Sequence, residues 1–428
     1  MPTESTDYRQ MWSDLGLDLE AHDALLEVLG QGYQAVFLSQ QNRPKGMEYF
    51  DFVMSEVHGL RVKELLDEKA AGRKVFGSFC VFVPEEIVKA ADGTLVGLCT
   101  GADFAMDAVE EYLPRNTCAL IKSAFGFKLG KVCPYIESVD LIIGENTCDG
   151  KKKAYETLDT IVPNLYVMDL PQVKNARGRE LLKVEYMRFL RKVEELSGVT
   201  IDVARMKQGI ARVNAKRAAL HRLAALRAVA PAPISGLDAL LINQVSFYDD
   251  TERFTQSVNA ICDELDARVA AGEGVFPKGT PRILMSGCPM AVPNWKLPWV
   301  IESAGGVIVG EESCVGERGM RGLVSDEGET LEELISNIVD RYFDIDCAIF
   351  TPNTDRLGHV REMHESYAAD GVIHYSLNFC QPYQMESYPV AQALQNEGVP
   401  VLRIETDYSP EDAEQLKTRV EAFLEMIQ

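Results

Sequence analysis

The sequence predicts an α/β protein in which two parallel-sheet domains face a central cleft, with helices at the N-terminus and a helical connector between the domains. Three observations carry this prediction. Strand-like apolar runs alternate with helical segments in two separate parts of the chain, long helical segments lie between those parts, and cysteines recur at the ends of strand-like runs in both. Such alternation is typical of a parallel sheet with helices on its faces.

The chain divides into four expected segments. A length of 428 residues favours more than one domain. We expect an N-terminal helical segment at 1–70, a first α/β domain at 71–177, a helical connector at 178–278 that the proline-containing stretch 231–233 interrupts, and a second α/β domain at 279–428. Both α/β domains are expected to be flavodoxin-like (Rossmann-like).

Each segment is expected from its own pattern of elements. The N-terminal and connector helices are expected at 18–37, 49–72, 179–198, 201–228 and 252–272. The strand-like runs of the first α/β domain are those at 73–83, 94–99, 140–148 and 164–173. The apolar segments of the second are those at 279–290, 305–314, 345–353, 371–380 and 399–409, and an amphipathic helix at 411–428 ends the chain. Pro84 marks a helix start, because proline lacks the backbone donor that would be unsatisfied there.

Composition excludes several classes of partner. A net charge of −22 makes the chain repel nucleic acid and anionic membrane surfaces. The first residues lack the basic and then apolar character of a signal peptide, and no stretch approaches the roughly 18 uninterrupted apolar residues of a membrane span. We therefore expect a cytoplasmic protein without a membrane anchor. Because structural disulfides are rare in the cytoplasm, the ten cysteines favour metal binding.

The positions of the cysteines predict one shared site. Cys99 and Cys148 end strand-like runs, and Cys118 precedes the amphipathic run ALIKSAF. Ligands collect beyond the carboxyl ends of strands in open α/β sheets. The second half repeats this order, so two sheet rims are expected to face one cleft. The matched cysteines of the two halves are Cys80, Cys99 and Cys148 against Cys288, Cys314 and Cys380, with Cys118 and Cys347 at intermediate positions. Single thiols donated by separate loops favour an iron–sulfur centre.

Alternative interpretations apply to some of these thiols. Cys262 lies in the middle of a helical segment and is expected to be a buried apolar thiol. Cys80, in VFGSFCVFV, and Cys288 fit core burial as well as ligation. Zinc is disfavoured because no Cys-x2-Cys pair or histidine ligand motif is present. The sequence also lacks a GxxxxGK[ST] phosphate loop, a G-x-S-x-G elbow and a G-x-G-x-x-G fingerprint.

Several stretches resemble those of a known superfamily. They are FVPEEI, LPRNTCALIKSAFGF, VCPYIESVDLIIGENTCDGKKK, ILMSGCPM, GVIHYSLNFCQPY and IETDYSPEDAEQLKTRVEAFLE, which extend from about residue 75 to the C-terminus. In these stretches the chain resembles the 2-hydroxyacyl-CoA dehydratase / benzoyl-CoA reductase superfamily, and within it the double-cubane cluster proteins.

The resemblance implies a cofactor and its ligands. Three cysteines hold one [4Fe-4S] cubane in the dehydratases, and the matching positions here are Cys118, Cys148 and Cys380. The double-cubane branch implies an [8Fe-9S] centre on six cysteines. The additional three chosen from the sequence are Cys133, Cys314 and Cys347, with Cys99 in reserve. A [4Fe-4S] cluster on the first three cysteines alone is the alternative.

The resemblance also implies how the chain functions. It implies a homodimer from an anaerobic setting that reduces a small molecule and receives low-potential electrons from a separate homodimeric, ATP-hydrolysing iron–sulfur activator. A 2-hydroxyacyl-CoA dehydratase subunit and a non-catalytic electron-transfer protein are the alternatives. Glu145 and Arg318 are candidate catalytic groups, for proton delivery and anchoring. Backbone N–H groups after Cys118 and Cys148, with Lys122 and the lysines at 151–153, are expected to offset the negative charge of a cluster, although Lys152 fits a solvated helix face better.

Overall fold

The computed structural model describes residues 7–428 and contains two sheets of four parallel strands each. The strand orders are β2-β1-β3-β4 and β6-β5-β7-β8, so the two halves repeat one topology. The strands of the first sheet are β1 (Val75–Ser78), β2 (Thr94–Gly97), β3 (Leu141–Glu145) and β4 (Leu165–Met168). Those of the second are β5 (Arg282–Gly287), β6 (Val307–Glu312), β7 (Gly371–Leu377) and β8 (Val401–Thr406). The prediction of an α/β protein with two flavodoxin-like sheets is confirmed.

Helices surround both sheets. The N-terminal helices are α1 (Arg9–Asp14), α2 (Leu19–Tyr33), the π-helix η1 (Gln34–Leu38), α3 (Met47–Ser55) and α4 (Leu60–Ala70). The first half contributes α5 (Glu85–Ala90), α6 (Met106–Tyr112), α7 (Ala119–Leu129), α8 (Pro134–Ser138) and α9 (Asp149–Leu158). The connector holds α10 (Ala176–Ser197), α11 (Val203–Arg227), α12 (Gly236–Val245) and α13 (Thr251–Ala271). The second half contributes α14 (Lys296–Ser303), α15 (Glu317–Met320), α16 (Leu331–Phe343), α17 (Thr354–Ser366), α18 (Gln381–Asn396) and α19 (Ala413–Ile427).

Most expected elements are present, with local differences. Strand β1 is shorter than the apolar run that predicts it, because the chain turns away after Ser78. The apolar segment 345–353 forms neither a helix nor a strand, although Ile345, Cys347 and Ile349 are buried. Residues 1–6 of the expected N-terminal segment lie outside the described residues, and the domain boundaries stay a prediction. No helix in residues 7–428 is long and apolar enough to cross a membrane.

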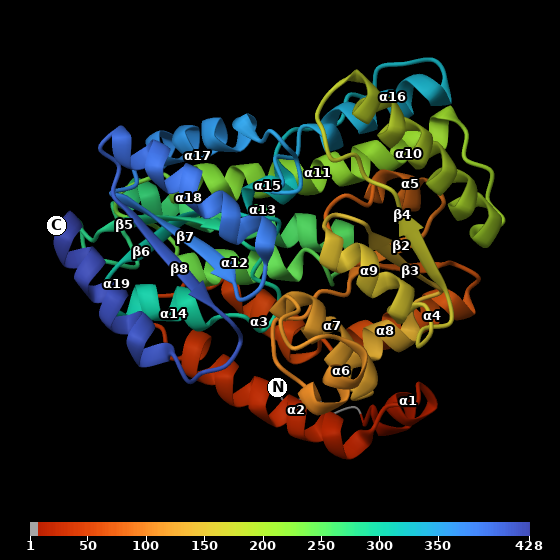
Figure 1. Ribbon diagram of the computed structural model, residues 1–428, viewed down its shortest axis with the longest axis horizontal. Helices are drawn as coiled ribbons and strands as arrows, with labels where there is room; N and C mark the ends of the chain where they lie inside the picture. Colours follow the sequence, from red (N-terminus) through yellow and green to blue (C-terminus); the bar gives the residue numbers. More distant parts are fainter. Residues whose placement is uncertain (1–6) are drawn as a thin grey trace.

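The two sheets lie apart, with helices of the connector between them (Figure 1). The central strands β3, β5 and β7 are buried along their whole length, as their continuous apolar sequences require in a parallel sheet covered on both faces. One large cluster of buried apolar side chains includes residues of both sheets and of the connector. The halves therefore share a core instead of meeting at a polar interface.

Helix α12 is the innermost part of the connector. All of its residues are buried, and it contacts α3, α14 and β6. The Ser235 side chain caps its first turn. Just beyond its end, the carbonyl oxygen of Phe247 accepts a hydrogen bond of 2.8 Å from the Gly97 N–H at the end of β2. This helix thus joins the second sheet to the carboxyl end of a strand of the first.

A buried ion pair links three helices from different parts of the chain. The Arg217 guanidinium on α11 donates to the Glu86 carboxylate on α5 at 2.6 Å and to the Tyr342 hydroxyl on α16 at 3.0 Å. The Tyr342 hydroxyl donates to the other Glu86 oxygen at 2.9 Å. Because each buried polar group here has a partner, the contact holds the halves in one arrangement.

Glu302 gives the fold a defined pH dependence. Its buried carboxylate accepts backbone N–H bonds from Gly236 at 2.7 Å, Leu237 at 3.2 Å and Ile308 at 3.1 Å. Burial raises the pKa of Glu302 from 4.5 to about 7, although those hydrogen bonds oppose the shift. The folded state therefore keeps a proton that the unfolded state releases. The associated stability is present below pH 4.5 and is lost as the pH rises through 7, a change of about 3 kcal/mol.

We expect the Glu302→Gln variant to lose this part of the pH dependence, because an amide does not titrate. Melting temperatures of the wild type and the variant between about pH 5 and pH 8 measure the effect. The control is Glu425→Gln, an exposed carboxylate on α19, which should follow the wild-type curve. An unchanged pH slope in Glu302→Gln would contradict the assignment.

Candidate cysteine-lined cluster site

One pocket between the two sheets gathers most of the cysteines. It encloses about 1000 Å³ of space between atoms, part of it open to solvent. Eight of the ten cysteines line it. They are Cys80, Cys99, Cys118, Cys148, Cys288, Cys314, Cys347 and Cys380. The prediction that thiols from both halves meet in one cleft agrees with this arrangement.

The topology of the sheets explains why these thiols meet. Cysteines follow the carboxyl ends of β1, β2, β3, β5, β6 and β7, and only the edge strands β4 and β8 contribute none. In the first sheet the order reverses between β1 and β3, and in the second between β5 and β7. Such switch points open a crevice at the carboxyl ends of the strands. Two crevices facing each other make one pocket.

Three of the thiols occupy helix starts. Cys118, Cys148 and Cys380 stand at the N-cap positions of α7, α9 and α18. Backbone N–H groups in the first turns, among them those of Ile121 and Lys151, lower the pKa of Cys118 and Cys148 against the effect of burial. A helix N-terminus offers unpaired N–H groups and a partial positive charge, so it stabilises an anionic sulfur.

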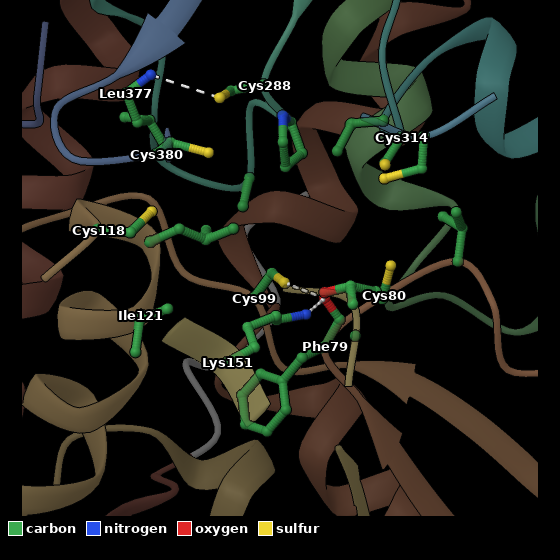
Figure 2. Close-up of a pocket in the computed structure, with 18 of the residues that line it drawn as sticks. Phe79, Cys80, Cys99, Cys118, Ile121, Lys151, Cys288, Cys314, Leu377 and Cys380 are labelled. Carbon is green, nitrogen blue, oxygen red and sulfur yellow. Dashed lines mark hydrogen bonds between the residues drawn. The ribbon is translucent and has the colours of Figure 1, made fainter. Parts of the chain in front are cut away.

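These three thiols, which we call the outer group, face an open groove. Cys118, Cys148 and Cys380 line both the cysteine pocket and a large groove between α9 and α18. The neighbouring Cys380 thiol, together with burial, raises the pKa of Cys118. Figure 2 shows Cys118 and Cys380 on one side of the pocket and Cys80 and Cys314 on the other. The outer group therefore has the access that a small molecule requires.

A second set of thiols, the inner group, lies across the pocket and consists of Cys80, Cys314 and Cys347. The neighbouring Cys80 thiol and the Arg318 guanidinium lower the pKa of Cys314 despite burial. The Arg318 Nη1 atom lies 3.5 Å from the Cys314 sulfur. Cys347 lies 3.7 Å from the Tyr383 hydroxyl. Proximity of Cys314 also raises the pKa of Cys347, after burial.

Two further pocket thiols have partners of their own. The Cys99 thiol donates to the carbonyl oxygen of Phe79 at 2.7 Å, and burial raises its pKa to about 12. The Cys288 sulfur accepts a hydrogen bond of 3.4 Å from the Leu377 N–H and also contacts Cys380. Cys288 therefore lies beside Cys380 of the outer group, whereas the Cys99 thiol is engaged by a backbone carbonyl.

The two candidate catalytic groups lie behind the thiols and do not line the pocket. Glu145, at the end of β3, accepts from the Cys80 N–H at 3.2 Å and lies 3.7 Å from Lys151. Burial raises the pKa of Glu145 to about 7. Arg318 is fully buried and bonds Glu312, with the shorter contact at 2.5 Å. Both residues contact side chains that line the pocket, Glu145 through Lys151 and Arg318 through Cys314 and Tyr383.

The lysines that sequence analysis associated with the cluster separate in the structure. Lys151 lines the pocket and donates to the Phe79 carbonyl at 3.3 Å. Burial lowers the pKa of Lys151, but Tyr155, Cys80 and Glu145 outweigh it and hold the ammonium charged. Lys122, Lys152 and Lys153 do not line the cysteine pocket.

Two cysteines lie outside the pocket. Cys133 is buried in a separate apolar cluster with Tyr135 and Ile136, whose N–H groups reach its sulfur. Cys262 is buried in the middle of α13, as its helical context predicts. Cys133 directly precedes the short helix α8 and then β3, so it lies at the amino end of a strand. Of the six ligands expected from the sequence, Cys133 is therefore the one that does not line the pocket.

The donor set fits an iron–sulfur cluster better than a single ion. Among residues 7–428, no three His, Cys, Asp or Glu side chains converge as ligands of one metal ion. A cubane distributes its thiolates over several irons, so its ligands surround a volume instead of a point. The pocket has such an arrangement, because two groups of three thiols surround it and N–H groups and buried cations lie behind them.

Some pocket residues are not evident from the sequence alone. The apolar context of Cys80 fits core burial as well as ligation, yet β1 ends at Ser78, so the strand-end rule that identified Cys99 applies to Cys80 equally. Tyr383 was missed, although its position three residues after Cys380 places it in the first turn of α18. Phe247 and Tyr248 of the connector also line the pocket, and no local motif indicated them.

Comparisons with known proteins identify the family. A model described as "2-hydroxyglutaryl-CoA dehydratase, D-component" matches residues 80–427, and the chain belongs to this family. It is 38% identical over 370 residues to the putative dehydratase subunit YjiM of Escherichia coli (strain K12), a match that covers 85% of this chain and 94% of that protein.

More distant relatives confirm the superfamily. The (R)-phenyllactyl-CoA dehydratase beta subunit of Clostridium sporogenes is 23% identical, with 83% of this chain and 92% of the relative covered. A benzoyl-CoA reductase subunit of Thauera aromatica is also 23% identical, with 78% and 86% covered. The resemblance to the 2-hydroxyacyl-CoA dehydratase / benzoyl-CoA reductase superfamily is thereby confirmed.

Gly287 should be essential to the pocket wall. It ends β5 at a φ of +134°, and a Cβ there would lie 1.9 Å from the carbonyl oxygen of Tyr375 on β7. We expect Gly287→Ala to destabilise the protein by about 3 kcal/mol, from overpacking and backbone strain, and to displace Cys288.

The matched control is Gly358→Ala in helix α17, where a Cβ meets nothing within 4 Å. This change should stabilise the protein by roughly 0.5–1 kcal/mol, because alanine favours a helix interior. Chemical denaturation of both variants measures the difference. Equal stabilities would show that the approach of β5 to β7 is not tight.

Proposed function

We propose that this chain is an iron–sulfur reductase of a small molecule, and that it receives low-potential electrons from a separate homodimeric, ATP-hydrolysing iron–sulfur activator. Its cofactor is a double-cubane [8Fe-9S] cluster. The observation that carries the proposal is that six thiols line one pocket in two groups, with Cys118 and Cys380 on one side and Cys80 and Cys314 on the other (Figure 2). The named relatives are subunits of dehydratases and of a reductase, which supports an enzyme.

The six proposed ligands are the outer group and the inner group. The outer group of Cys118, Cys148 and Cys380 holds one cubane. The inner group holds the other and differs from the expectation at one position, since Cys80 replaces Cys133. Cys80 is preferred to Cys99 because its thiol contacts Cys314, whereas the Cys99 thiol donates to a backbone carbonyl. When bound, the cluster supplies low-potential electrons to a substrate.

The chain's own residues prepare the pocket for this charge. Thiolates and sulfides in a poorly hydrated space are costly unless donors face them. The first turns of α7, α9 and α18 supply N–H groups, and Lys151 and Arg318 supply buried positive charge. Apolar side chains of the pocket, among them Phe79, Ile121 and Phe247, limit the access of water.

The charge of the groove in front of the outer group favours a small-molecule substrate and disfavours a CoA thioester. Its charged lining residues are Asp149, Glu156 and Glu386 with Lys153, and Lys153 pairs with Glu156 at 2.7 Å. The phosphates of CoA need cationic or N–H partners. In the described part of the chain the groove has a net negative lining, and the N–H groups of its three helix starts face sulfur.

The remaining parts of the proposal rest on the family and the composition. The proposal couples electron delivery to ATP hydrolysis, and this chain lacks the phosphate loop that would bind ATP. A separate activator protein is therefore proposed to hydrolyse it. A homodimer, a cytoplasmic location and an anaerobic setting complete the proposal. The absence of nucleic-acid and membrane partners follows from the net charge of −22.

A dehydratase subunit with one [4Fe-4S] cluster is the second candidate. The names of two relatives, a phenyllactyl-CoA and a 2-hydroxyglutaryl-CoA dehydratase subunit, favour it. It uses only the outer group and leaves the three inner thiols, with their buried arginine, without a role. A non-catalytic electron-transfer protein would hold the same cluster and turn over no substrate.

Iron content separates these candidates. We expect anaerobically purified protein to contain roughly eight irons per chain, and Cys80→Ser to lose a large part of them while Cys133→Ser retains them. Cys262→Ser is the matched control, because that thiol is buried in helix α13 away from the pocket. Iron and sulfide analysis with EPR after reduction gives the readout.

About four irons per chain, unaffected by Cys80→Ser, would support the dehydratase candidate instead. Protein without iron would contradict every cluster-based function. A full complement of iron without any turnover, measured with the activator and ATP supplied, would favour the electron-transfer protein.

A further inference from the structure

The two thiol groups are faced by different polar groups. Near the outer group these are backbone N–H groups in the first turns of α7, α9 and α18, which favour the thiolate form of its cysteines. The inner group is faced by side chains, since Arg318 Nη1 lies 3.5 Å from the Cys314 sulfur and the Tyr383 hydroxyl lies 3.7 Å from the Cys347 sulfur. The two ends of the pocket are therefore electrostatically unequal.

The position of Arg318 is determined by its partners. Its Nε and Nη2 atoms bind one oxygen of Glu312 at 2.9 Å and 2.5 Å, and Asp346 lies 3.4 Å from Nε. These carboxylates occupy one edge of the guanidinium. The remaining atom, Nη1, points at Cys314 and at the Tyr383 hydroxyl. The positive edge thus faces sulfur, and the compensating negative charges lie behind it.

Tyr383 extends this arrangement to a second thiol. Its ring is buried, and the guanidinium groups of Arg318 and Arg356 lie 5.3 Å and 4.7 Å from the ring centre. Its oxygen accepts a hydrogen bond from Arg318, so its own proton is free to point at Cys347. Arg318 and Tyr383 together supply a charge-assisted pair of donors to two of the three inner thiolates.

Resting on the proposed double cluster, we infer that Arg318 and Tyr383 make its two halves unequal in reduction potential. With the cluster bound, Arg318 and Tyr383 would make the inner half the easier to reduce, so the first electron would be stored there. The outer half, which faces the groove, would be reduced second. Charge-assisted hydrogen bonds are roughly twice as strong as neutral ones, and donors to sulfur raise the potential of a cluster.

The electron count of this scheme is simple. A one-electron donor, which is the activator in function or dithionite in a test, loses one electron, and the inner half gains it with no bond formed or broken. A second donor turnover reduces the outer half. Arg318 and Tyr383 are positioning residues in this scheme, because they act through Cys314 and Cys347 and touch no substrate.

A redox titration of the cluster-loaded, full-length protein tests the inference. We expect two one-electron steps in EPR-monitored titrations. Tyr383→Phe and Arg318→Lys should lower the reduction potential of the first step by about 59 mV, which is roughly a tenfold change in its equilibrium constant. The potential of the second step should not change. Tyr383→Phe keeps the ring and its contacts with the two guanidinium groups. This variant therefore still tests the shift in potential if Arg318→Lys loses its cluster.

Tyr408→Phe is the matched control. The Tyr408 hydroxyl is buried near Cys118 and Cys288 and has no hydrogen-bond partner among the described residues. Its removal should shift neither step. Equal shifts of both steps in Tyr383→Phe, or no shift, at full iron content would overturn the inference alone. A wild type with only about half of the expected iron would instead overturn the proposed function, and this inference with it.

Discussion

The structure depends on bringing many thiols into one poorly hydrated space and offsetting the charge that they would carry as thiolates. A buried anion without partners costs several kilocalories per mole or shifts its pKa. The raised pKa values of Cys99, Cys118 and Cys347 show this cost. Helix N-termini, Lys151 and Arg318 are the groups that reduce it. A bound cluster would share the same donors.

Closure of the pocket depends on contacts far from the thiols. The connector lies between the sheets, with α12 buried along its length and Phe247 bonded to the end of β2. The Glu86–Arg217–Tyr342 contact joins the first half, the connector and the second half. Because the rims belong to different sheets, a loosened connector would separate the two thiol groups. We therefore regard the helical connector as part of the site.

Much of the fold was predictable from local pattern. Strand-like runs ending in Cys99, Cys148 and Cys314 indicated parallel sheets and the edge at which the thiols collect, because the topological rule applies to any such strand. The strand orders and the role of α12 could not be predicted from local pattern, because both depend on contacts between segments far apart in the chain.

The ligand set shows where local pattern fails. Cys118 and Cys133 each precede a helix, so they share a local signal. Helix α7, which has 11 residues and is therefore about 16 Å long, carries the chain away from Cys118 before Cys133 is reached. Cys133 then lies before β3 instead of after a strand. Local sequence does not show which end of a sheet a helix start occupies.

An iron anomalous-difference map from anaerobically grown crystals tests the central claim most directly. The account predicts two adjacent groups of iron in the pocket, one bound by Cys118, Cys148 and Cys380 and the other by Cys80, Cys314 and Cys347. Iron bound by the outer group alone, or by Cys133, would contradict it.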